Sequence, residues 1–244
     1  MDSELRQARA TSFGPVAEAY ERSRPLYPEE AVRWLASDTP ADVLDLGAGT
    51  GKLTRQLVTL GHRVVAVDPL PEMLEQLRAA VPGVEALQGT GEAIPLAAES
   101  VDVVTIAQAF HWLDPVAALP EIARVLRPGG VLGLIWNVRH ESTPWAARLS
   151  EIIGSELISE STVADRVGAS GLYGAVETRE FRNEQRLDRD GLLDLVLSRS
   201  YCVLQPLEER EQVLAEVGRL YDAEAGAEGL ILPYLTDAHR AVRL

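Results

Sequence analysis

The sequence is poor in cysteine, in basic residues and in long apolar runs. Its single cysteine, Cys202, excludes an internal disulfide and suits a reducing compartment. Lys and Arg total 23 against 37 Asp and Glu, and the resulting net charge of −14 disfavours binding to a phosphate backbone. No apolar run is long enough to cross a bilayer, and the polar residues 1–15 lack the apolar stretch of a signal peptide. We therefore expect a cytoplasmic protein that binds neither nucleic acid nor a membrane.

The sequence also lacks a cluster of metal ligands. The four histidines are scattered along the chain, and one cysteine cannot complete a thiolate site. We therefore expect no metal centre. The length of 244 residues suits one sizeable domain, with or without a smaller attached lobe.

What the sequence does contain is an alternation of apolar strand-like segments with helical ones. The strand-like segments lie at residues 42–47, 63–69, 84–90, 101–110 and 131–136, and the helical ones at 51–61, 71–83 and 115–130. Nearly continuous apolar strands that alternate with helices predict a parallel sheet covered on both faces, which is the doubly wound α/β fold. Ligands of such folds bind at the carboxyl ends of the strands.

After Trp136 the alternation becomes looser. Helical patterns occur at residues 143–159, 190–201 and 207–225, and strand-like patterns at 176–187 and 229–244. We expect this half of the chain to complete the sheet and to cover the site. Trp34, Trp145, Tyr201 and Tyr234 are interpreted as core or interface residues, and Cys202 as a small buried residue.

A glycine-rich turn, DLGAGTGK, follows the first strand. It is not a P-loop, because Leu53 stands where a hydroxyl would ligate magnesium and Leu46 stands where the first glycine is needed. The spacing G-x-G-x-G also differs from the dinucleotide turn, and the carboxylate of Asp45 would repel a pyrophosphate. A second acid, Asp68, ends the next strand. The turn therefore favours a ligand with a cationic tail and hydroxyl groups.

These features resemble the class I S-adenosylmethionine-dependent methyltransferases, whose first motif is an acid, any residue, and then G-x-G-x-G. The resemblance implies a Rossmann-like sheet of seven strands. It implies that Asp45 lies at the methionine moiety near its ammonium group, and that Asp68 accepts hydrogen bonds from the ribose hydroxyls. It also implies that the backbone of Gly47, Ala48 and Gly49 lies against the cofactor.

The resemblance extends to other cofactor contacts. Residues 89–96, GTGEAIPL, are similar to the adenine segment of the family, with Thr90 and Gly91 where Asp and Ala are usual. The adenine contact is left open between Thr90, Glu92 and backbone groups. The remaining implied cofactor contacts are Tyr20, Pro69, Met73 and Gln108. The implied cofactor is S-adenosyl-L-methionine, with S-adenosyl-L-homocysteine as its product.

The segment AQAFHWLDP and the N-terminal FGPVAEAYERSRPLYP are similar to the trans-aconitate methyltransferase-like group. This similarity implies one domain over residues 1–244, with lid helices at 1–38, the cofactor-binding core at 39–137 and substrate-side elements at 138–244. His111 is either a general base or part of the pocket wall. The other implied substrate contacts are Arg24, Tyr27, Trp112, Trp136, Asn137 and Arg139.

The predicted activity is methyl transfer to an oxygen, nitrogen or carbon atom of a small molecule. Such a transfer is an in-line displacement that depends on alignment more than on acid–base chemistry. Two alternatives remain at this stage: a cofactor-binding protein with a scaffold or cyclase role, and a nicotinamide-dependent reductase. The sequence does not distinguish a monomer from a homodimer.

Overall fold

The computed structural model describes most of the chain, namely residues 21–154, 160–199, 202 and 205–244. The chain divides into two compact units. The core unit consists of residues 26–136, 158–181 and 236–244, and the second unit of residues 1–25, 137–157 and 182–235. All described residues that we expect at the cofactor belong to the core unit.

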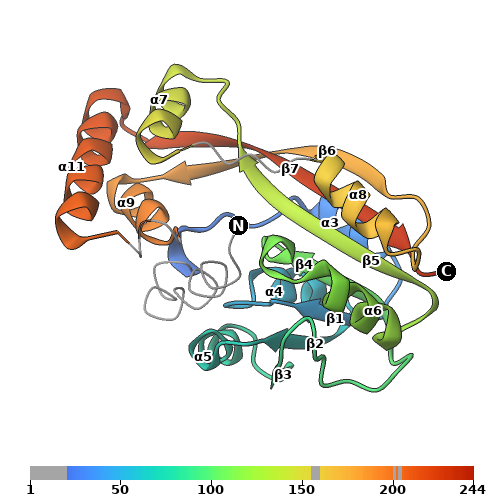
Figure 1. Ribbon diagram of the computed structural model, residues 1–244. Helices are drawn as coiled ribbons and strands as arrows, with labels where there is room; N and C mark the ends of the chain where they lie inside the picture. The colour runs from blue at the N-terminus through green and yellow to red at the C-terminus, as the bar shows by residue number, and fades with distance from the viewer. Residues whose placement is uncertain (1–20, 155–159, 200–201, 203–204) are drawn as a thin grey trace. The chain divides into compact units, whose positions relative to one another are not determined.

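Seven strands form one sheet in the order β3-β2-β1-β4-β5-β7-β6, which confirms the predicted fold. The strands are β1 (Asp42–Leu46), β2 (Arg63–Asp68), β3 (Glu85–Gln88), β4 (Val101–Ala107), β5 (Leu126–Arg139), β6 (Glu177–Leu187) and β7 (Leu230–Val242). β1 pairs in parallel with β2 and β4, and the outer pairs β2–β3 and β4–β5 are parallel too. The carboxyl ends of β1 to β5 therefore lie at the same edge of the sheet (Figure 1).

Strand β7 runs antiparallel to β5. The amide of Arg243 donates to the carbonyl of Gly130 at 2.8 Å, and the amide of His140 donates to the carbonyl of Pro233 at 2.9 Å. As the residue number rises along β5, the number of its hydrogen-bonded partner in β7 falls, which shows that the two strands are antiparallel. Strands β5, β6 and β7 each have residues in both units, so the predicted boundary at residue 137 falls inside a strand.

Most helices of the described residues lie at the helical patterns of the sequence, but the helix at residues 160–169 has no matching pattern, and the helix predicted for residues 143–159 ends at Ile153. The helices are α3 (Glu29–Ala36), α4 (Lys52–Thr59), α5 (Pro71–Ala80), α6 (Pro115–Val125), α7 (Pro144–Ile153), α8 (Glu160–Ala169), α9 (Arg189–Leu197) and α11 (Leu207–Glu224), with a short 3₁₀ helix, η2 (Phe110–Trp112). α6 and α7 begin with proline, and the side chains of Asp114 and Thr143 cap them. Within the described residues, no helix has both the length and the apolar character that a membrane span requires.

Each unit has an apolar cluster of its own. In the core unit, α3 and α4 pack against the sheet through residues such as Leu35, Leu57 and Val43. In the second unit, α7, α9 and α11 share a cluster with β7. Trp145, Tyr234 and Cys202 are buried in that second cluster, as predicted.

The start of β5 differs from the prediction. The sequence pattern predicts a helix that ends at Pro128, but α6 ends at Val125 and extended backbone begins at the next residue. Val101 pairs with Leu126 and Val103 with Val131, so four residues of β5 bulge out between these pairs. Proline disfavours helical backbone in the residue before it, here Arg127, so Pro128 prevents the helix from reaching its predicted end.

The end of β4 also differs from the prediction, because the strand stops at Ala107 and not at Phe110. The next residue, Gln108, has a φ of +57°, in the left-handed region that residues other than glycine rarely adopt. This conformation turns the chain out of the strand and into η2. Apolar periodicity does not reveal such a residue.

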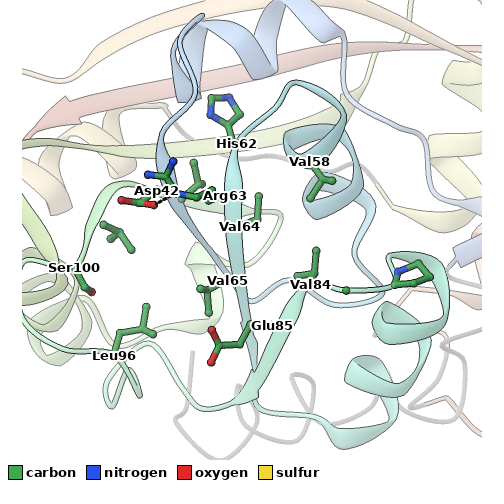
Figure 2. Close-up of a pocket in the computed structure, with 14 residues that line it drawn as sticks. Asp42, Val58, His62, Arg63, Val64, Val65, Val84, Glu85, Leu96 and Ser100 are labelled. Atoms are coloured by element: carbon green, nitrogen blue, oxygen red, sulfur yellow. Dashed lines mark hydrogen bonds and ion pairs between the residues drawn. The ribbon is translucent and has the colours of Figure 1, made fainter.

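A hollow of about 530 Å³ lies at the amino-terminal ends of β1 and β2. Figure 2 shows Val65 and Glu85 on one side of β2, and Val58 and Val84 on the other. None of the predicted site residues lines it. We therefore look for the functional site at the opposite edge of the sheet, where the glycine-rich turn lies.

Candidate functional site

The glycine-rich turn has three left-handed glycines, with φ values of +69° at Gly47, +56° at Gly49 and +88° at Gly51. A Cβ atom on Gly47 would lie 2.8 Å from Cβ of Ala109, and one on Gly51 would lie 2.9 Å from Cγ of Leu77. A Cβ atom on Gly49 would meet no atom within 4 Å. Gly49 thus combines a left-handed backbone with open space, where a ligand can approach the main chain.

The backbone amides of the turn donate to acceptors within the protein. Gly47 and Ala48 both donate to the carbonyl of Val67, at 2.8 and 3.1 Å. The amide of Gly49 donates to a carboxylate oxygen of Asp68 at 2.8 Å. Loops that bind phosphates direct such amides at the ligand instead. The turn is therefore not built as an anion cradle.

Asp45 lies at the end of β1 and is fully buried. Its carboxylate accepts hydrogen bonds from the hydroxyls of Thr54 at 2.6 Å and Thr105 at 3.2 Å. Burial raises the pKa of Asp45 to about 6; the two hydroxyls oppose this shift, and the charge of Asp68 adds to it. The residue that precedes α4, Gly51, has no side chain to cap the helix, and the Asp45 carboxylate also accepts from the backbone amide of Thr54 in the first turn.

Asp68 lies at the end of β2 and is 6% exposed. One carboxylate oxygen accepts from the amide of Gly49 at 2.8 Å, and the other accepts from the amide of Leu70 at 2.9 Å. Burial raises the pKa of Asp68, and the hydrogen bonds from these two backbone amides oppose the shift. Each carboxylate oxygen has further acceptor capacity, which suits a pair of hydroxyl groups. The negative charge of Asp45 already lies at the start of α4, so the turn does not favour an anionic ligand.

The segment after β3 connects Asp68 with the start of α6. The amide of Asp114 donates to the Glu92 carboxylate at 2.9 Å, so this carboxylate has a partner within the protein. A Cβ atom on Gly91 would lie 2.8 Å from the side chain of Leu113, which explains why glycine replaces the usual alanine here. Thr90 is exposed. Thr90 and the neighbouring backbone are therefore better candidates for the adenine contact than Glu92, whose carboxylate already has a partner.

The comparisons with known proteins agree with this geometry. Residues 44–134, which contain the turn, both acids and most of β5, match the family model of a methyltransferase domain. An uncharacterized methyltransferase of Mycobacterium tuberculosis is 50% identical over 239 residues, covering 97% of each chain. The chain belongs to the class I S-adenosylmethionine-dependent methyltransferases.

Solved structures support the methyltransferase fold. A putative type II methyltransferase from Anaeromyxobacter dehalogenans superposes with a TM-score of 0.62 at 28% identity, over 90% of this chain and 96% of that chain. A malonyl-[acyl-carrier protein] O-methyltransferase of Methylococcus capsulatus is 39% identical, but over only 50% of this chain and 48% of its own. That match leaves half of each methyltransferase unmatched, so it does not identify the acceptor.

The turn of this methyltransferase fits the cofactor of its family. The open space at Gly49 lies beside the carboxylate of Asp68. The hydrogen bond from the Gly49 amide to this carboxylate holds the two groups together. Pro69 is exposed directly after β2, whereas Met73 is 4% exposed in α5 and packs mainly inside the protein. Tyr20, another predicted contact, lies outside the described residues.

Three predicted residues follow β4 at the same edge. Gln108 has its left-handed backbone here, and its amide donates to the carbonyl of Ile135 at 2.9 Å. Strained backbone conformations of this kind occur most often at functional sites. His111 is exposed, and its ring lies 4.3 Å from the ring of Trp112, centre to centre. An exposed imidazole at this edge suits either of the two predicted roles of His111.

Two other predicted substrate contacts in the core unit are buried. Tyr27 is 8% exposed, and its backbone exchanges two hydrogen bonds with the side chain of Gln56. Trp136 is 1% exposed, and its ring packs edge-on against His239 at 5.7 Å. A fully enclosed ring offers no surface to a substrate, so we interpret Trp136 as part of the core.

The last three predicted substrate contacts belong to the second unit. Arg24 donates to the hydroxyl of Ser198 at 2.9 Å and to its carbonyl at 3.2 Å. The side-chain oxygen Oδ1 of Asn137 accepts a hydrogen bond from the side-chain amide of Asn183 at 3.0 Å. Arg139 donates to the carbonyl of Gly154 and is 6% exposed. These contacts fix the three side chains within the unit, and their role toward a substrate stays a prediction.

Sequence reasoning missed several polar residues that the structure brings into networks. In the core unit these are Thr54 and Thr105, the partners of Asp45. In the second unit, Gln185 donates to the carbonyl of Ser23 at 2.6 Å and accepts from the hydroxyl of Tyr234 at 3.3 Å. One signal was visible, because Thr105 is the polar residue in the otherwise apolar run VVTIA. Among the described residues, no three His, Cys, Asp or Glu side chains form a group that could hold a metal ion.

Proposed function

We propose that this methyltransferase transfers a methyl group from S-adenosyl-L-methionine to an oxygen, nitrogen or carbon atom of a small molecule. The observation that carries this proposal is the turn itself. The amides of Gly47, Ala48 and Gly49 donate to acceptors of the protein, and so does the amide of Thr54 in the first turn of α4, while a Cβ atom on Gly49 would meet no atom within 4 Å. A ligand that brings hydroxyls and no phosphate fits this arrangement.

Each part of the cofactor has a proposed partner in the core unit. The backbone of Gly47 and Gly49 lies against the methionine end, Asp68 accepts from the ribose hydroxyls, and Thr90 with its neighbouring backbone contacts adenine. S-adenosylmethionine supplies a sulfonium methyl group that needs no further activation. The protein then has to align the acceptor and exclude water.

His111 is the residue that we propose to lie nearest to the acceptor. Its exposed ring beside Trp112 can remove a proton from a hydroxyl or a carbon acid. A carboxylate acceptor needs no base, and His111 then acts as part of the pocket wall. Replacing His111 by Gln separates these cases, because the loss of rate depends on pH only where the imidazole takes the proton.

Calorimetry with S-adenosylhomocysteine tests the proposed function. We expect binding to the wild-type chain and a loss of roughly hundredfold in affinity for Asp68→Ala, which removes a charged hydrogen-bond acceptor. Thermal protection by the nicotinamide dinucleotide but not by S-adenosylhomocysteine would instead indicate a reductase. Methyl transfer to a panel of hydroxy, amino and carboxylic compounds then identifies the acceptor, and binding without any transfer would favour a scaffold role.

A further inference from the structure

Three residues from three elements enclose the carboxylate at the start of the turn. Asp45 ends β1, Thr54 lies in the first turn of α4, and Thr105 lies opposite Asp45 in the neighbouring strand β4. All three side chains are fully buried. The carboxylate group is thus enclosed by protein, and solvent has no access to it.

The acceptor capacity of this carboxylate is largely used within the protein. One oxygen accepts the hydroxyl of Thr54 at 2.6 Å, and the other accepts the hydroxyl of Thr105 at 3.2 Å. The backbone amide of Thr54 donates to the carboxylate as well. These donors use much of the acceptor capacity of the group, although the one proton of the Thr105 hydroxyl is shared with the carbonyl of Leu44 at 3.4 Å.

The second acid of the turn has a different environment. Asp68 retains some exposure, at 6%, and both of its recorded donors are backbone amides. Its bond to the amide of Gly49 places it directly beside the open space of the turn. We expect a ligand in that space to meet Asp68, because Asp68 is hydrogen-bonded to Gly49 and slightly exposed, whereas Asp45 is fully buried.

We propose that Asp45 is a positioning residue, which acts through Thr54 and Thr105 to fix the turn and the start of α4 and makes no contact with the ammonium group of the cofactor. The proposal rests on the proposed function, because it assumes that the cofactor binds at this turn. It assigns to Thr54 and Thr105 a role in cofactor affinity, although neither side chain can reach a ligand.

Two ligands separate positioning from contact. S-adenosylhomocysteine carries the ammonium group, and 5′-methylthioadenosine has the same adenosine and sulfur but lacks the amino acid. If Asp45 positions the turn, Asp45→Asn weakens the binding of both ligands by the same factor, roughly tenfold. If Asp45 contacts the ammonium group, the variant loses affinity for S-adenosylhomocysteine and keeps its affinity for methylthioadenosine, and the proposal is then wrong.

The threonines provide a second test with a matched control. Thr54→Val keeps the shape of the side chain and removes its hydroxyl, whereas Thr54→Ser keeps the hydroxyl. We expect Thr54→Val to lower the affinity for both ligands by the same factor, and Thr54→Ser to bind both ligands with an affinity close to that of the wild type. Unchanged affinity in a folded Thr54→Val protein would overturn the proposed role of Thr54, and this comparison remains available if Asp45→Asn does not fold.

The dependence of affinity on pH provides a readout that a merely structural role would not change. The hydroxyls of Thr54 and Thr105 and the backbone amide of Thr54 donate to the Asp45 carboxylate, and the charge of Asp68 acts on it as well. The Thr54 hydroxyl stabilises the ionised form of Asp45, so its removal raises the pKa of Asp45 further. Asp68 titrates as well, but its recorded partners do not include Thr54.

We therefore measure the affinity for methylthioadenosine between pH 5 and pH 8, the range around the pKa of about 6 for Asp45. Affinity is expected to fall toward acid, and the midpoint of this fall is expected to lie at higher pH in Thr54→Val than in wild type. The same midpoint in both proteins would overturn the inference while S-adenosylhomocysteine still binds the wild type. If the wild type binds neither ligand, the proposed function fails, and the inference fails with it.

Discussion

The acidic residues at the two ends of the parallel strands have opposite environments. At the amino-terminal ends, Asp42 and Asp102 share the guanidinium of Arg127, and Asp42 also pairs with Arg63 at 2.6 Å. The hydrogen bond from Arg63 lowers the pKa of Asp42, with help from Arg127. At the carboxyl ends, Asp45 and Asp68 accept from hydroxyls and amides, and burial raises both pKa values.

This difference separates acids that stabilise the fold from acids that prepare a site. A paired, half-exposed carboxylate ties neighbouring strands together at modest cost. A buried carboxylate with neutral donors costs stability, and proteins retain such groups mainly where function needs them. The predictions below test this contrast, from the largest expected effect to the smallest.

The largest effect concerns the stability of the protein as a function of pH. Because the pKa of Asp45 is raised to about 6, its contribution to stability is fully present below about pH 4 and is lost as the pH rises through 6. Asp45→Asn removes this titration, so we expect the stability of the variant relative to wild type to rise by up to about 3 kcal/mol between pH 4 and pH 8. Denaturant unfolding at pH 4 and pH 8 measures this rise, and a stability difference that is the same at both pH values would contradict it.

The next effect compares one acid from each end of the sheet. Asp68→Ala is expected to weaken S-adenosylhomocysteine binding by roughly hundredfold, or about 2.7 kcal/mol, because it removes charged hydrogen bonds at the site. Asp42→Ala is the control, and we expect it to leave the affinity unchanged. Calorimetry on both variants decides the matter; a comparable loss in Asp42→Ala would show that the two ends do not differ in function.

A third comparison uses two glycines with the same backbone angle. Gly51 at the turn and Gly83 before β3 both have φ of +88°, but a Cβ atom would lie 2.9 Å from Leu77 only at Gly51 and would meet nothing within 4 Å at Gly83. Alanine at either position costs about 1 kcal/mol of left-handed strain, and at Gly51 the clash adds about 1–3 kcal/mol. Thermal unfolding measures the difference, and equal destabilisation would mean that Leu77 moves aside freely.

The smallest effect is expected at the ion pairs of the amino-terminal ends. Asp42→Asn should lower stability by less than about 1 kcal/mol at neutral pH, and by less still in high salt, because Arg63 is exposed and Arg127 is half-exposed. The lowered pKa of Asp42 means that its contribution is present above about pH 4 and is lost as the pH falls through the folded-state value. Urea unfolding at two salt concentrations checks this, and a loss independent of salt would argue against a surface ion pair.

The sequence was sufficient to predict the parallel core and the glycine turn, because both depend on local patterns. Apolar runs identify the strands, and the spacing of Gly47 and Gly49 together with Asp45 identifies the family. The direction of the Asp45 side chain was not predictable, because it depends on Thr105, which is 60 residues away and meets Asp45 only across a strand pair. The division into two units was predictable only in part, because the change of unit after Trp136 lies next to the predicted boundary at residue 137, whereas the later changes inside β6 and β7 have no local signal.

The hydrogen bonds of the glycine turn have a consequence for the cost of binding. Gly47, Ala48 and Gly49 donate to Val67 and Asp68, so acceptors of the protein itself hold the shape of the turn. The turn is therefore preorganised, and an incoming ligand does not have to spend binding energy on ordering it.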